Sequence, residues 1–121
     1  MKTSELTGRA LDWAVAKCEG VTVLPKMRGG CYVTLDRGET VLLCYSTNWS
    51  QGGPIIERES IGVVTSPDDA NVWIGSIFEP DWKFNRTGPT PLIAAMRCYV
   101  ASKLGDEVEI PEELLIKGKS K

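Results

Sequence analysis

The stretch TPLIAAMRCYVASKLG, residues 90–105, decides the fold. Thr90 is placed to cap a helix, Pro91 suits the first helical position, and Gly105 suits the end. We therefore predict a helix from about residue 91 to residue 104. Its apolar side chains cover most of its circumference: Leu92, Ile93, Ala95, Met96, Tyr99, Val100 and Leu104. A helix that is apolar nearly all round is expected to be buried, in the core or at a contact between subunits.

The segments before this helix predict a second helix and several strands. A first helix is expected over residues 7–18, with Thr7 as its cap and Gly20 as its stop. Trp13 is expected to project from the polar side of this helix, under a loop. Segments rich in β-branched and aromatic residues predict strands over residues 21–24, 31–35, 40–45, 61–65 and 72–78. Residues 46–54 and 79–86 are predicted as irregular loops, with one helical turn over residues 55–59.

Short, turn-rich connections between these strands favour antiparallel pairing. The predicted class is α+β. We expect an antiparallel sheet of four to six strands, packed with an N-terminal helix and an apolar C-terminal helix. The length of 121 residues fits a single domain over residues 1–121.

Charge and composition exclude several classes of function. The net charge of −2 gives no general attraction to nucleic acid or to an anionic membrane. No apolar run is long enough to cross a bilayer, and the N-terminus has no apolar signal core, so we expect a cytoplasmic protein. The four cysteines are isolated and there is no histidine, which predicts buried reduced thiols, no metal site and no cofactor.

The same absence of histidine argues against an enzyme. Ser-His-Asp and Cys-His arrangements are impossible, and neither of the common glycine-rich phosphate-binding motifs occurs. We therefore expect a protein that binds and does not catalyse.

The glycine-rich segment at residues 49–54 is the first candidate site. Gly52 and Gly53 would let the backbone approach a ligand, and Gln51 offers both a donor and an acceptor beside Trp49. The alternative is an ordinary wide connection with a glycine turn.

Three further residues are candidates because they suit an anion. Arg97 lies in the apolar helix, so its guanidinium must either extend to solvent or meet an anion. The anion is either Glu57 or Glu59, in an internal ion pair, or a phosphate or carboxylate of a ligand. Thr90 marks a helix start whose free amides form a weak anion site. Arg58 is a softer candidate, because a solvated run of charges explains it equally well.

Four segments carry a resemblance to a known family: KTSELTG at residues 2–8, ALDWAVAK at 10–17, WSQGGPIIERE at 49–59 and GPTPLIAAMRCYVASKLGDEV at 88–108. They resemble the phage NinX family of small accessory proteins. The resemblance implies no established reaction, which agrees with the missing catalytic groups.

A looser likeness in size, order of elements and placing of polar residues is to the phage Thoeris anti-defence proteins. Those proteins are homo-oligomers that sequester signals of the cyclic ADP-ribose type. The resemblance implies that Arg58 and Arg97 meet phosphates and that Phe78, Trp49 or Trp82 stacks on a base. The hypothesis is a phage accessory protein that sequesters a nucleotide-derived signal and dimerises in part through the apolar helix.

Two other hypotheses stay open. The chain is alternatively a module that masks a host or phage protein, with Trp13 and the loop at residues 82–84 as the contact. A binder of single-stranded nucleic acid, stacking bases on Trp49, Trp82 and Phe84, is the least favoured because the chain is acidic.

Overall fold

The computed structural model describes residues 2–21, 31–34, 40–77 and 84–110. The elements in chain order are η1 (Thr3–Glu5), α1 (Gly8–Glu19), β1 (Cys31–Thr34), β2 (Thr40–Leu43), α2 (Trp49–Glu59), β3 (Ile61–Thr65), β4 (Trp73–Ile77), β5 (Arg86–Gly88) and α3 (Pro91–Leu104). The predicted α+β class is confirmed. The described strands divide into two antiparallel sheets, a β1-β2 pair and a three-stranded sheet in the order β3-β4-β5.

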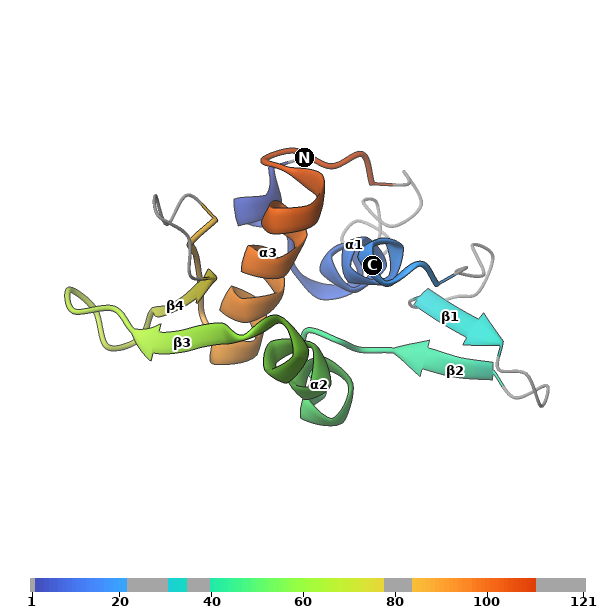
Figure 1. Ribbon diagram of the computed structural model, residues 1–121, viewed down its shortest axis with the longest axis horizontal. Helices are drawn as coiled ribbons and strands as arrows, with labels where there is room; N and C mark the ends of the chain where they lie inside the picture. The colour runs from blue at the N-terminus through green and yellow to red at the C-terminus, as the bar shows by residue number, and fades with distance from the viewer. Residues whose placement is uncertain (1, 22–30, 35–39, 78–83, 111–121) are drawn as a thin grey trace, which may run out of the picture.

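Helix α3 forms the centre of the molecule, between the three-stranded sheet and α1 (Figure 1). The predicted caps are confirmed: the Thr90 hydroxyl accepts from the N–H of Ile93 at 3.1 Å, and Gly105 follows the last turn. Nine side chains of α3 are buried: Leu92, Ile93, Ala94, Ala95, Met96, Cys98, Tyr99, Val100 and Ala101. The chain itself covers this helix, so α3 needs no partner subunit to bury its apolar surface.

Two glycines let the three-stranded sheet lie close to α3. A Cβ at Gly75 of β4 would lie 2.5 Å from the carbonyl oxygen of Ala94, and one at Gly88 of β5 would lie 2.8 Å from the nitrogen of Ala94. Real Cβ atoms do not approach other atoms so closely, so only glycine permits this contact. The sheet therefore meets the small-residue side of α3, Ala94 and Ala95.

Helix α1 matches its prediction to within one residue at each end. Gly20 takes the left-handed conformation (φ 76°) at its end, whereas Thr7 stands at the N-cap without a capping hydrogen bond from its side chain. Trp13 is half-buried and packs against the core, with the ammonium nitrogen of Lys17 5.4 Å from the centre of its ring. It therefore belongs to the packing of α1 in the part of the chain described.

The strand predictions hold for β1, β2, β3 and β4, while one short strand was missed. β5 begins at Arg86, where the sequence predicted a loop, and it pairs with β4 through Gly75↔Arg86 and Trp73↔Gly88. Of the strand predicted at residues 21–24, only Val21 is described, and it lies outside any strand.

The prediction of an irregular segment at residues 46–54 was wrong beyond Asn48. Helix α2 begins at Trp49, where the Asn48 side chain accepts from the N–H of Ser50 at 2.9 Å. Two glycines and Pro54 disfavour a helix locally, but packing overrides that preference. Ile55 is buried in the core, and α2 also contacts α3.

Candidate functional site

An open depression of about 210 Å³ lies where the starts of α2 and α3 meet. Its lining consists of Ser46, Thr47, Trp49, Thr90, Leu92 and Ile93. Leu92 and Ile93 are buried and contribute an apolar floor, whereas Trp49 is 54% exposed at the rim. The depression thus joins an exposed indole to an apolar floor, bordered by hydroxyl groups.

The polypeptide around this depression is held by bonds from distant residues. The N–H of Ser46 donates to the Asp12 carboxylate at 2.8 Å. Gln51 accepts from the N–H of Cys44 at 2.6 Å and donates to the carbonyl of Leu42 at 3.1 Å. Gln51 therefore joins α2 to β2, and its amide is engaged within the protein.

The two glycines of α2 have different roles. A Cβ at Gly52 would lie 2.4 Å from the carbonyl oxygen of Tyr45 and 2.7 Å from the Leu92 side chain. Gly52 is buried, so its small size serves the contact between α2 and α3 and not the approach of a ligand. At Gly53 the nearest atom would be in the Trp49 ring, at 3.8 Å, which is an ordinary contact.

Arg97 forms neither of the pairs that the sequence predicted. Its Nε donates to the carbonyl of Leu6 at 2.7 Å, and its Nη1 donates to the carbonyl of Thr87 at 2.8 Å. Burial lowers its pKa. The prediction of an ion pair with Glu57 or Glu59 is wrong, because the guanidinium donates its hydrogen bonds to two backbone carbonyls instead. Arg97 lies outside the lining of the depression.

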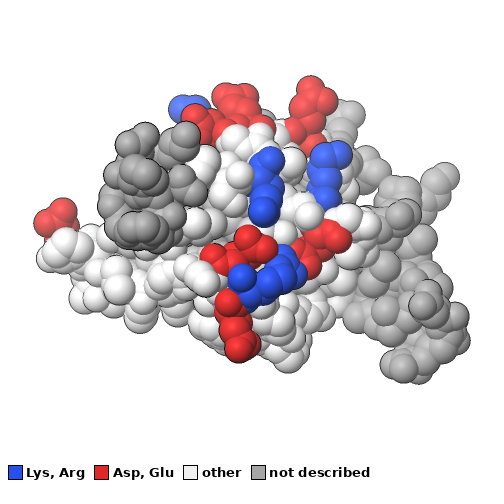
Figure 2. All heavy atoms as spheres, in the orientation of Figure 1, with Lys and Arg blue, Asp and Glu red and all other residues white. Residues whose placement is uncertain are grey.

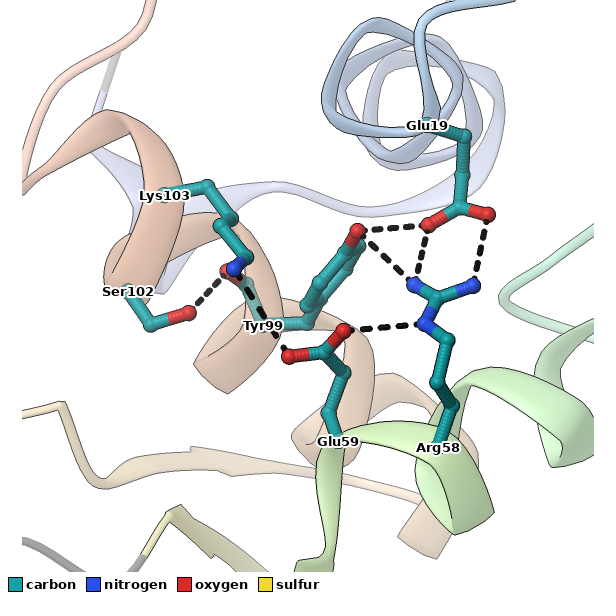
Figure 3. A network of polar contacts seen from close by, with 6 residues as sticks. All are labelled: Glu19, Arg58, Glu59, Tyr99, Ser102 and Lys103. Carbon is teal, nitrogen blue, oxygen red and sulfur yellow. Dashed lines mark hydrogen bonds and ion pairs between the residues drawn. The ribbon is translucent and has the colours of Figure 1, made fainter.

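Arg58 belongs to a network and not to a solvated run of charges (Figure 3). Its guanidinium contacts both Glu19 oxygens, at 2.6 and 3.1 Å, and donates to the Tyr99 hydroxyl at 3.1 Å and to Glu59 at 2.9 Å. The Tyr99 hydroxyl donates to Glu19 at 2.5 Å, and Lys103 lies 3.7 Å from Glu59.

This network joins the ends of α1 and α2 to α3. The hydrogen bonds from Arg58 hold the pKa of the Glu19 carboxyl below its usual range. Burial, followed by the bond to Glu19, raises the pKa of the Tyr99 hydroxyl. Figure 2 shows the charged side chains of this face gathered in a mixed cluster of both signs. Such a cluster offers no field of a single sign for an anionic ligand.

The predicted site residues therefore separate in space. Trp49 and Thr90 line the depression, Gln51 and Gly52 hold its walls, and Phe78 lies outside the described residues, as does Trp82. The sequence missed the lining by Ser46, Thr47, Leu92 and Ile93. The capping residues at the two helix starts can be recognised from the local sequence. No local pattern indicates that the two helix starts lie side by side.

Cysteines and metal-binding groups give no second site among residues 2–21, 31–34, 40–77 and 84–110. Within these residues no cluster of three His, Cys, Asp or Glu side chains could hold a metal ion. Cys98 is buried and Cys18 and Cys44 are half-buried, all three as free thiols. Burial raises the pKa of both Cys18 and Cys98 to about 11. Thiols with such pKa values are poor nucleophiles at neutral pH.

A protein-family model described as "Bacteriophage P22, NinX" matches residues 2–103. The chain belongs to the phage NinX family. The matched region of this NinX-family chain runs from the segment before η1 into the last turn of α3, so it includes the whole depression and the Arg58 network. A search of the curated proteins found no match, and the likeness to Thoeris anti-defence proteins stays a prediction. Among the helices described, none has the length and apolar character needed to cross a membrane.

Proposed function

We propose that this NinX-family chain is a phage accessory protein that masks another protein by binding it at the depression beside Trp49, without catalysis. One observation carries the proposal: Trp49 is 54% exposed next to a floor formed by Leu92 and Ile93. Trp side chains beside apolar pockets are typical centres of protein interfaces. The depression replaces Trp13 and the loop at residues 82–84 as the proposed contact.

The size of the depression favours a protein partner. Its volume is about 210 Å³, whereas sites that enclose small ligands commonly measure roughly 300–1,000 Å³. A depression of this size accommodates one large apolar side chain projecting from a partner, with Trp49 packing on the partner in return.

The competing proposal is sequestration of a nucleotide-derived signal of the cyclic ADP-ribose type. The Trp49 ring supports it as a stacking surface, and the two helix starts at the depression favour an anion. The arginines weaken it, since Arg58 and Arg97 are bonded within the protein. No Lys or Arg is among the lining residues, and helix termini each contribute only about 0.3–1 kcal/mol to binding of a charge.

The test compares Trp49→Ala with Leu42→Ala, a control at a second exposed apolar residue, 39% exposed on β2. Cytosolic extract of phage-infected bacteria is passed over each immobilised protein, since we propose that the protein acts in the host cytoplasm. Proteins retained by the wild type are then purified, and their affinities are measured by calorimetry. We expect Trp49→Ala to weaken binding roughly 30-fold or more, as hot-spot residues do, and Leu42→Ala to change it little.

A thermal-shift screen against cyclic ADP-ribose isomers and cyclic oligonucleotides distinguishes the competing proposal. A ligand at ~100 times its dissociation constant adds roughly 2.7 kcal/mol of stability, which moves the midpoint visibly. A shift that Trp49→Ala abolishes would establish nucleotide binding at the depression. Equal binding of a protein partner by wild type and Trp49→Ala would refute the masking site.

A further inference from the structure

Among the strands that the structure describes, β3 pairs with β4 alone in the order β3-β4-β5, so one edge of the three-stranded sheet is open within the described part of the chain. Strand β3 runs along the side of the molecule in Figure 1. Its sequence, IGVVT at residues 61–65, contains neither a charged residue nor a proline. Proteins usually protect an open edge with such residues, because an unprotected edge is a template for another strand. Figure 2 shows mostly uncharged surface over β3.

The register shows which backbone groups β4 already binds. The N–H of Ser66 donates to the carbonyl of Val72 at 2.7 Å, one step beyond the last pair of the ladder. In an antiparallel ladder, hydrogen-bonded pairs alternate with non-bonded pairs. The residues of β3 bonded to β4 are therefore Val64 and Gly62, which lie two and four positions before Ser66.

The alternate residues present their backbone groups to the open edge. These are Ile61, Val63 and Thr65, each with one N–H and one C=O directed away from β4. Within the part of the chain that the structure describes, no residue bonds to these groups from the open side. Thr65 is exposed and Val63 is half-buried, whereas the side chain of Ile61 belongs to the core, which leaves 6% of that residue exposed. An additional strand can therefore bond to the outward backbone groups of these residues without disturbing the ladder to β4.

We propose that a second copy of this chain adds its own β3 to this edge, antiparallel, with Val63 on the twofold axis. Ile61 then lies opposite the partner's Thr65, and Val63 opposite the partner's Val63. Each of the three outward residues then forms a hydrogen-bonded pair with a residue of the partner, and the two sheets join into one continuous sheet. Because the contact is self-complementary, the assembly closes after two copies. The open β3 edge of each copy is then paired with the other.

The side chains of β3 explain why the occupant is another copy. Val64 is 58% exposed and Gly62 is also exposed, on the face of the sheet away from the core. In the proposed register Val64 lies opposite the partner's Gly62, in a non-bonded pair, where side chains approach most closely. Gly62 has no side chain and leaves room for the valine. The match is reciprocal, and no charge on β3 opposes its own copy.

This contact differs from the dimer through α3 that the sequence predicted, since α3 is buried within the chain. It is also separate from the depression, whose lining contains no residue of β3. Dimerisation and partner binding can therefore be tested independently.

The test is the mass of the full chain, measured by sedimentation over a concentration series. The wild type is expected to sediment with twice the mass of one chain. Thr65→Pro removes an N–H from the open edge only, whereas the control Thr65→Val keeps that N–H. In the Thr65→Pro dimer each copy lacks the hydrogen bond from its residue 65 to the partner's Ile61, so two bonds between the subunits are lost. Its dimer dissociation constant should therefore rise roughly tenfold or more, while that of Thr65→Val stays close to the wild type.

Val64→Lys gives a second variant at an exposed position, where the monomer should fold unchanged. It brings two ammonium groups near the twofold axis and should also dissociate the dimer, more strongly at low salt. Circular dichroism verifies folding of each variant, and Trp49→Ala should remain dimeric. A monomeric wild type, or folded Thr65→Pro and Val64→Lys variants that dimerise as strongly as Thr65→Val, would overturn the proposal.

Discussion

The backbone N–H of Ser46 and the carboxylate of Asp12 form a buried hydrogen bond of 2.8 Å between residues 34 positions apart. Asp12 lies on α1, and Ser46 lines the depression just before α2. Burial raises the pKa of the Asp12 carboxyl, although the bond from Ser46 acts in the opposite direction. This one contact connects the first helix of the chain to the wall of the proposed site.

Asp12→Ala should destabilise the protein and loosen that wall. The substitution removes the acceptor and leaves the buried N–H of Ser46 without a partner, which costs about 1–3 kcal/mol. Asp12→Asn is the matched control, because its side-chain oxygen can still accept. Urea unfolding monitored by tryptophan fluorescence measures both; equal stability of Asp12→Ala and Asp12→Asn would contradict the assigned role.

Asp12 should also impose a pH dependence that Asp12→Asn lacks. A carboxyl with a raised native pKa binds more protons in the folded state than in the unfolded state. The contribution of Asp12 to the stability of the folded state is therefore fully present below the pKa of the unfolded state. It is lost as the pH rises through the higher pKa of the folded state. The stability of Asp12→Asn relative to the wild type should accordingly increase from acid to neutral pH, measured as the difference between their urea-unfolding free energies.

Gly52→Ala and Gly53→Ala should have opposite effects, although the two residues are adjacent in α2. The new Cβ at residue 52 meets the Tyr45 carbonyl at 2.4 Å, and such overpacking costs about 1–3 kcal/mol. At residue 53 the nearest contact is 3.8 Å, so alanine should stabilise the helix by roughly 0.5–1 kcal/mol. Thermal denaturation of both variants measures the difference, and destabilisation of equal size would contradict this packing.

Glu19→Gln should weaken the network that joins α1, α2 and α3. Arg58 is 50% exposed, so solvent limits the effect to about 1 kcal/mol at neutral pH. The pKa of Glu19 is lowered in the folded state. The stabilisation is therefore present above the unfolded pKa and lost as the pH falls through the lower native value. The free energies of unfolding of wild type and Glu19→Gln, measured by urea unfolding, should therefore become equal in strong acid. A difference in stability that persists there would show that the ion pair is not its cause.

Arg97→Met should destabilise the fold by about 1–3 kcal/mol, because it leaves two carbonyl acceptors without their donor. These are the carbonyls of Leu6 and Thr87, 91 and 10 positions away in sequence. Arg97→Lys should recover only part of the loss, since one ammonium group cannot reproduce the two directions of the guanidinium. Chemical unfolding tests this order, and full recovery by lysine would show that charge alone matters.

The sequence by itself determined the class of the fold and the two helices that carry most of the core. The Thr90 cap, Pro91 and the Gly105 stop are local signals, and the buried stripe of α1 follows helical spacing. Such signals act within one or two turns, so they can be recognised without knowing what the helix packs against.

Only the tertiary structure decided where the polar side chains find their partners. Arg58 bonds to Glu19 across 39 positions, and Arg97 bonds to Leu6 across 91. The helical state of residues 49–54 likewise depends on Ile55 entering the core and on Gly52 fitting against Tyr45 and Leu92. A depression formed by two helix starts requires those starts to meet, and their meeting depends on long-range packing, which the local sequence pattern does not record.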